Sequence, residues 1–211
     1  MVVLDAGGGW MRPARALLPL GLVLAVACVD ASERTEGPPD TAAATDPQLV
    51  FWASLESLCG QAFRGHVVES EPPDASFEGQ ALVMHVRECQ IGEVRIPFYV
   101  GEDRSRTWVI TTTAAGIRLK HDHRHEDGTE DEITQYGGDT RGQGTDLVQD
   151  FHADALTAAL VPAAATNVWT IEVEPGRRFA YALRREGSDR RFRVEFDLRA
   201  PIETPPPPWG G

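Results

Sequence analysis

Three histidines alternate along one short stretch of the chain and are its clearest candidates for chemistry. His121, His123 and His125 stand within Gly116–Gly138, a segment typical of two β-strands joined by a tight polar turn at residues 127–129. Alternate residues of a strand point to the same side, about 6.6 to 7 Å apart, so neighbouring imidazoles can converge on Zn²⁺ or Cu²⁺. Apolar residues precede the histidines on the same face, which predicts that this face turns toward a core.

Two interpretations of this histidine face remain open. A metal site needs further ligands from a neighbouring strand, and His85 is the obvious donor. The alternative is a polar lining at the mouth of a barrel, hydrogen-bonded to Tyr136, Thr111 or water. We favour the lining, because the sequence shows no further ligand set at a recognisable spacing. We therefore expect the histidines to orient a ligand, with no metal and no other cofactor.

The segments around the histidines predict a mostly β fold. Strand-like runs separated by short turns rich in Gly, Asp, Pro and Ser occur at residues 63–69, 80–89, 93–100, 107–113, 116–138, 167–173, 179–185 and 191–199. About eight to ten such strands in an antiparallel meander close most naturally into an up-and-down barrel, and a β-sandwich is the alternative. The expected inward side chains are Val83, Ile96, Phe98, Val109, Trp169, Ile171, Phe179, Tyr181, Phe192 and Phe196.

Two helices are expected beside the strands. Asp46-Pro47 predicts the start of an amphipathic helix that Gly60 ends. Residues 139–166 interrupt the strands, and we expect a glycine-rich loop followed by a short helix capped by Thr145 or Asp146.

Composition bounds the possible partners. The 211 residues carry a formal charge of −12, which argues against a nucleic-acid partner because phosphate binding needs a basic surface. With 42% hydrophobic residues, the chain can bury one sizeable core, so we expect one barrel domain over residues 46–200. The proline-rich residues 201–211 are expected to form an extended tail outside it.

The amino-terminal segment has the features of an export signal. Residues 1–28 contain a positive region, an apolar run and small residues before Cys28, and Met11 is the more natural start. The run Leu24-Ala25-Val26-Ala27-Cys28 resembles the lipobox of bacterial lipoproteins, which implies diacylation of Cys28 and a membrane anchor. Val29 after the cysteine then implies the outer membrane within the cell envelope. An ordinary secretory signal is the alternative, and residues 29–45 are expected to be a flexible tether.

The short helix ending in Leu58-Cys59-Gly60, the strand opening Phe63-Arg64-Gly65 and the meander after them resemble the calycin barrels, that is lipocalins, fatty-acid-binding proteins and their bacterial relatives. The resemblance is one of layout over about residues 47–200 and implies binding of a small, partly apolar ligand. In fatty-acid-binding proteins an Arg-x-Tyr pair holds the ligand carboxylate. Arg177 and Tyr181 are the candidates here, at Arg-x-x-x-Tyr spacing. Haem-binding barrels of this kind use a histidine near the carboxyl end, and no histidine follows His152.

The number of cysteines predicts one disulfide. If Cys28 is acylated, Cys59 and Cys89 remain as a pair in an oxidising compartment. The bridge requires the end of the first helix to pack over the strand that ends at Cys89, with Cα atoms within about 7 Å. Two buried thiols are the alternative.

These observations together predict an exported, lipid-anchored protein that binds a small apolar or amphipathic ligand and is not an enzyme. Its candidate ligand-binding residues are His85, His121, His123, His125, Tyr136, Trp169, Arg177 and Tyr181. Two other classes compete: an envelope structural or interaction module whose barrel is filled by side chains, and a metal-dependent enzyme that uses the histidine face. An empty interior of several hundred Å³ would favour ligand binding, whereas a filled one would favour the interaction module.

Overall fold

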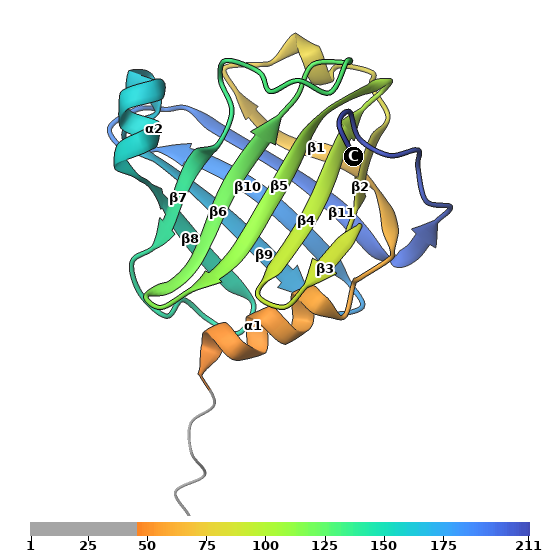
Figure 1. Cartoon of the computed structure of the whole chain (residues 1–211), viewed down its shortest axis with the longest axis horizontal. Coiled ribbons are helices and arrows are strands. Elements are labelled where there is room, and N and C mark those ends of the chain that lie inside the picture. Colours follow the sequence, from red (N-terminus) through yellow and green to blue (C-terminus); the bar gives the residue numbers. More distant parts are fainter. Residues whose placement is uncertain (1–45) are drawn as a thin grey trace, which may run out of the picture. The chain divides into compact units, whose positions relative to one another are not determined.

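The computed structural model describes residues 46–211, where neighbouring strands pair antiparallel in one sheet (Figure 1). The strands are β1 (Ala62–Glu71), β2 (Leu82–His85), β3 (Glu88–Gln90), β4 (Glu93–Val100), β5 (Asp103–Thr113), β6 (Gly116–His123), β7 (Tyr136–Thr140), β8 (Val148–Ala153), β9 (Asn167–Glu174), β10 (Arg178–Arg185) and β11 (Arg191–Ile202). β1 pairs with β11, and β2 pairs with both β1 and β4, which closes ten strands into a barrel. The up-and-down, calycin-like barrel predicted from the sequence is therefore confirmed.

The segment between residues 139 and 166 differs from the prediction. Val148–Ala153 forms β8 and pairs with both β7 and β9, where we expected a helix capped by Thr145 or Asp146. The helix α2 (Ala155–Leu160) begins later, at Asp154, whose side chain accepts a hydrogen bond from the backbone N–H of Thr157. Without β8 the sheet would have a gap between β7 and β9, so closure of the barrel decides the conformation of this segment.

The side chains that point inward at alternate positions of the strands fill the barrel. The core includes Met84, Ile96, Ile110, Leu119, Phe151, Trp169, Ile171, Phe179, Val194 and Phe196, all at most 1% exposed. Leu82 and Met84 of β2, and Trp108 and Ile110 of β5, take the inward positions. Val83 and Val109, which we expected inside, therefore lie on the outward faces of their strands.

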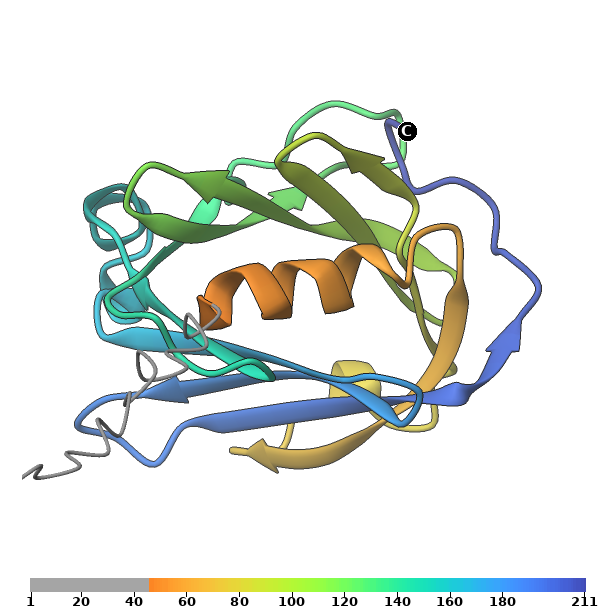
Figure 2. The same cartoon turned by 90° about the horizontal axis from the view of Figure 1, so that it is seen from below.

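The helix α1 (Pro47–Glu56) covers one end of the barrel, here called the closed end (Figure 2). Asp46 caps it by accepting a hydrogen bond from the backbone N–H of Gln48 at 2.9 Å, as the sequence predicted. Phe51 and Leu55 are fully buried in the same core as the strand side chains. The helix is thus a plug held by apolar packing. None of the described helices is long and apolar enough to span a membrane.

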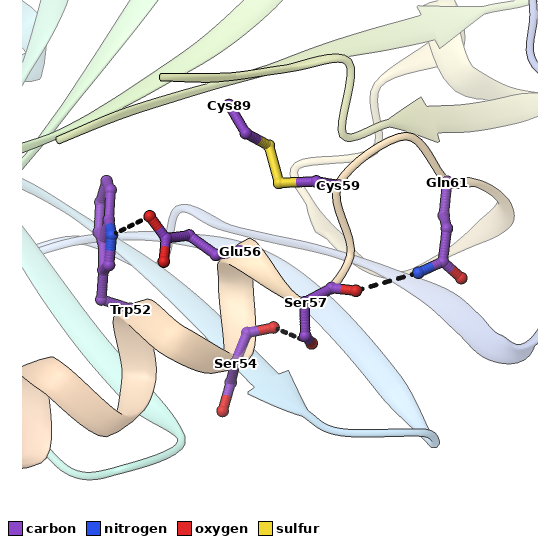
Figure 3. The surroundings of a disulfide bond; sticks show 7 residues. All are labelled: Trp52, Ser54, Glu56, Ser57, Cys59, Gln61 and Cys89. Carbon is purple, nitrogen blue, oxygen red and sulfur yellow. Dashed lines mark hydrogen bonds between the residues drawn. A yellow bond between two sulfur atoms is a disulfide. The ribbon is translucent and has the colours of Figure 1, made fainter. Parts of the chain in front are cut away.

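The chain that leaves α1 is joined to the wall of the barrel by a disulfide (Figure 3). Cys59 and Cys89 lie at bonding distance, with Cα atoms 6.2 Å apart, as predicted. The Trp52 indole donates a hydrogen bond to Glu56 at 2.7 Å within the same helix. The bridge therefore fixes the plug beside β3.

Residues 203–211 return along the outside of the barrel toward the opposite, open end (Figure 1). β11 runs to Ile202, two residues past the predicted domain boundary, and the tail then packs against β4 and β5 rather than standing apart from the domain. The predicted signal, Cys28 and the tether at residues 29–45 lie outside the described residues.

Candidate functional site

The open end of the barrel holds a small hollow that we call the aromatic cup. Its wall consists of Phe77, Phe98, Trp108, His121, His123, Tyr136, Tyr181, Leu183 and Phe192, with Asp74, Arg106 and Arg190 among the residues at its mouth. Trp108 stacks on Tyr181 with ring centroids 4.5 Å apart and on Phe98 with centroids 4.9 Å apart. These three rings therefore form one face-to-face stack in the lining of the cup.

The period of the strands explains how these side chains meet. Arg106 precedes the inward Trp108 by two residues, Arg190 precedes the inward Phe192 by two, and His123 follows His121 by two. Side chains two residues apart share a face, so each strand brings its next inward residue to the mouth. Phe77 also lines the cup. It comes from the loop between β1 and β2 and packs on Phe192 with ring centroids 4.8 Å apart.

His121 lies in the cup with both ring nitrogens hydrogen-bonded. Its Nδ1 is 3.1 Å from the carbonyl oxygen of Tyr136, and a carbonyl can only accept, so Nδ1 carries the proton. Its Nε2 is 2.8 Å from the Tyr181 hydroxyl and must accept from it. The imidazole also stacks on the Tyr136 ring at 4.4 Å between centroids. The tautomer and the ring plane of His121 are therefore fixed by its neighbours.

His123 is less enclosed than His121. Its Nε2 lies 3.2 Å from the Tyr136 hydroxyl, and its backbone N–H donates to Thr134 Oγ1 at 2.9 Å. Thr134 belongs to the loop after β6, so this loop holds the end of the strand. The pair of His123 and Tyr136 leaves polar atoms at the side of an otherwise aromatic hollow.

Burial keeps the polar lining of the cup uncharged near neutral pH. It lowers the pKa of His121 from 6.5 to about 3 and also lowers the pKa of His123. It raises the pKa of Tyr136 to about 12 and that of Tyr181 well above its ordinary value. All four side chains are thus neutral, and the tyrosine hydroxyls keep their protons.

Charge enters the cup at its mouth. Arg106 is paired with Asp103 of the same strand. Asp74 accepts hydrogen bonds from the backbone N–H and the hydroxyl of Ser76, which lower the pKa of its carboxyl, and both mouth arginines lower it further. The guanidinium of Arg190 makes no ion pair or hydrogen bond with any residue between 46 and 211. The mouth therefore presents one unpaired guanidinium beside an uncharged aromatic surface.

The cup is small because the rest of the barrel is filled. It encloses about 150 Å³, and below it the interior is occupied by Trp169, Phe179 and Phe196, each at most 1% exposed. A hollow of roughly this volume holds about one benzene-sized ring, whereas sites for drug-sized ligands span roughly 300 to 1,000 Å³. The space therefore fits a single small ring and is too short for a fatty-acid chain.

The structure brings together four of the eight predicted ligand-binding residues: His121, His123, Tyr136 and Tyr181. Trp169 lies beneath them, 5.3 Å from the His121 ring between centroids, and belongs to the core. His125 follows the end of β6 and is exposed, so it does not continue the inward face.

The other two predicted residues lie elsewhere. His85 is on the outward face of β2, 5% exposed, with its Nδ1 unpartnered within the described residues and its pKa lowered by burial. Arg177 is exposed in the turn between β9 and β10 at the closed end, where it pairs with Glu174. It therefore shares no site with Tyr181, and the carboxylate-binding pair implied by the fatty-acid-binding resemblance is not assembled.

Sequence reasoning missed Arg106, Arg190, Asp74 and Phe77. Both arginines had a detectable signal, since each stands two residues from an aromatic side chain expected or found inside. Asp74 and Phe77 come from an irregular loop, and nothing in their spacing indicates the cup.

No three His, Cys, Asp or Glu side chains within residues 46–211 gather into a group able to hold a metal ion. No protein-family model, curated protein or solved structure matches this chain in comparisons of sequence and structure. The calycin-like layout of the barrel and the geometry of the cup therefore provide the basis for a functional assignment.

Proposed function

We propose that this protein binds a small, planar, partly apolar ligand with an anionic group in the aromatic cup. The observation that carries the proposal is the unpaired guanidinium of Arg190 beside an aromatic-lined hollow of single-ring size. The role proposed is binding, in keeping with the ligand-binding function expected from the sequence.

The aromatic lining favours a ring. An aromatic ligand in the cup gains the burial of its surface together with contacts to the lining rings, each worth about 0.5 to 1.5 kcal/mol. His123 and Tyr136 lie at the side of this surface with a hydrogen-bonding edge that suits a ring substituent. A saturated chain would gain burial without stacking, and the volume limits its length.

The mouth favours a negative charge. The His and Tyr side chains of the cup are neutral, so they do not compete for an anion or repel one. Arg190 has no partner in the described residues, and a charge-assisted hydrogen bond to a carboxylate contributes about 1.5 to 3 kcal/mol. Asp74 opposes the anion, although the positive charges of Arg190 and Arg106 act on its carboxyl and lower its pKa.

Calorimetric titration with benzoate and with benzyl alcohol tests both parts of the proposal, with tryptophan fluorescence as a second readout because Trp108 lines the cup. We expect benzoate to bind and benzyl alcohol to bind more weakly. Arg190→Gln should weaken benzoate at least ten-fold and leave benzyl alcohol nearly unchanged. Arg191→Gln is the matched control, because Arg191 is the adjacent residue, exposed on the outer side of β11.

Absence of binding by either compound at millimolar concentration would contradict the cup as a ligand site. Equal affinity for both compounds, unchanged in Arg190→Gln, would leave a site for neutral rings and remove the anionic group from the proposal. Tight binding of dodecanoate would show that the interior opens further than its packing indicates.

The filled interior supports a second candidate, an envelope structural or interaction module. Its supporting observation is the buried set of Trp169, Phe151, Phe179 and Phe196, which leaves little space below the cup. Native mass spectrometry of protein purified from its own host distinguishes the two: a small bound molecule supports the first candidate, and a co-purified protein supports the second. We do not carry the metal-dependent enzyme forward, because His125 is exposed and both nitrogens of His121 are engaged.

We also propose that Cys28 carries a lipid that anchors the protein to a membrane of the cell envelope. The support is the small-residue run before Cys28 together with the even pair, Cys59 and Cys89, that it leaves behind. Fractionation of cells expressing Cys28→Ser tests the anchor. The variant should appear in the soluble fraction, and its retention with membranes would contradict the assignment.

A further inference from the structure

The outer face of β4 and β5 carries side chains that are buried although they point away from the barrel. Ile96 and Phe98 of β4 point inward, so Pro97 and Tyr99 point outward, yet Tyr99 is 4% exposed. The tail crosses this face on its way to the open end (Figure 1). We call the face lined by Pro97, Tyr99 and Arg104 the tail site.

The contacts between the tail and this site are made through backbone atoms of the tail. The Tyr99 hydroxyl donates to the carbonyl oxygen of Pro206 at 2.9 Å, and Arg104 Nη1 donates to that of Pro207 at 3.2 Å. The backbone N–H of Trp209 donates in turn to the Arg104 carbonyl at 3.1 Å. Two successive proline carbonyls are thus each matched by one side-chain donor.

This pattern is the chemistry by which proteins recognise polyproline II segments. Consecutive prolines favour this extended helix and have no N–H, so a surface that binds them must offer donors to their carbonyls and an apolar face to their rings. Tyr99 and Arg104 supply the donors, and burial raises the pKa of Tyr99 to about 12, so its hydroxyl stays a donor. Pro97 and the Tyr99 ring supply the apolar face.

The chain's own tail fills this site incompletely. A hollow of about 270 Å³ remains beside it, lined by Arg95, Asp122 and Arg124 on the barrel and by residues 208–211 of the tail. Glycines occupy positions 210 and 211, so the tail sends no side chain from them into the hollow, and the Trp209 Nε1 donor has no partner in the described residues. The hollow therefore lies beside the tail and not at Gly210 itself, where a Cβ would stand 2.8 Å from Arg124 Cδ and 3.0 Å from the Gly128 carbonyl oxygen.

We propose that the tail site is a recognition surface for a proline-rich segment of a partner protein, and that residues 204–209 occupy it as an internal competitor. The occupant is assigned from the segment seated there, with its run of four prolines followed by tryptophan. Displacement of the tail would free the two donors and the apolar strip together. Because the tail is attached to the same chain, it competes at a high effective concentration, and a partner segment must bind better or be present in excess.

The test uses the full chain with a weakened tail, so that residues 46–202 remain unchanged. The variant carries Pro206→Ala, Pro207→Ala and Trp209→Ala, and the probe is a fluorescent peptide of residues 203–211 followed by anisotropy. We expect the peptide to bind this variant at least ten-fold more tightly than the wild-type chain. Adding Tyr99→Phe should weaken the peptide about five-fold, since one neutral hydrogen bond is lost without a change of shape. Arg104→Gln should weaken it similarly, whereas Arg199→Gln, an exposed arginine of β11, should not.

Three results would overturn the proposal. The first is no difference between the weakened-tail variant and the wild-type chain at millimolar peptide. The second is equal binding of a peptide with both central prolines replaced by alanine, which would show that extended proline conformation is not recognised. The third is a concentration-dependent dimer of the wild-type chain that the tail substitutions abolish, which would assign the site to the tail of a second copy.

Discussion

The neutral, buried imidazole of His121 makes the stability of the barrel depend on pH. The folded state lowers its pKa to about 3, whereas an unfolded chain restores the ordinary value of 6.5. Since the unfolded state binds the proton first, the free energy of unfolding is unaffected above pH 6.5 and falls as the pH drops from 6.5 toward 3. At pH 5 the loss is about 2 kcal/mol, from 1.5 pH units at about 1.4 kcal/mol each. The lowered pKa of His123 acts in the same direction.

Urea unfolding at pH 7.5 and pH 5, with the disulfide intact, measures this loss. Above pH 5 most carboxylates remain ionised, so the histidines dominate the difference. The wild-type chain should lose about 2 kcal/mol more between the two pH values than His121→Gln. His66→Gln, at an exposed position of β1, is the control and should behave like the wild type. An equal loss in wild type and His121→Gln would refute the reasoning, because the buried imidazole would then contribute nothing.

Three further variants probe the framework that holds the cup, each measured by urea unfolding. Replacing Cys59 and Cys89 together by serine should lower the free energy of unfolding by roughly 3 kcal/mol, and an unchanged value would mean that the loop they close is already ordered in the unfolded chain. Gly138→Ala should prevent normal pairing of β7, because a Cβ there would lie 1.7 Å from a carbonyl oxygen of β8, whereas Gly142→Ala, with nothing within 4 Å, should be tolerated. Asp122→Asn should cost about 1.5 to 3 kcal/mol, since this buried carboxylate accepts hydrogen bonds from two arginines, and a loss under 0.5 kcal/mol would show that the pairs are dispensable.

Clear alternation allowed most of the barrel to be predicted from sequence. The bounds of β4 were predicted as observed, and the runs that became β9, β10 and β11 were placed within three residues at each end. β8 was missed because Gln149 and Asp150 are polar, so its sequence lacks the hydrophobic alternation by which the other strands were recognised. Gln149 is fully buried and donates to the carbonyls of Gln143 and Thr145, a local arrangement that hydrophobic patterning does not reveal.

Only some of the residues that line the cup could be predicted from the sequence. Alternation with Leu119 correctly placed His121 inside, and the same rule extended one step too far at His125, where the chain has left the strand for a tight turn. Trp169 was expected beside the ligand and lies under the cup, because period alone does not fix depth along the barrel axis. Arg190 and Phe77 come from sequence positions far apart, so only closure of the sheet brings them together.

The bridge at the closed end also decides how the domain carries mechanical load. Traction on the chain at Asp46 reaches α1 first and then Cys59, where the covalent link passes the force straight to Cys89. Residues 60–88, which include β1 and β2, lie inside the bridged loop and cannot be extended by that pull. Rupture from this side must therefore begin at the pairing of β3 with β4 rather than by unzipping β1 from β11. An oxidised domain should accordingly yield a shorter contour length than a reduced one when it is stretched from its amino-terminal side.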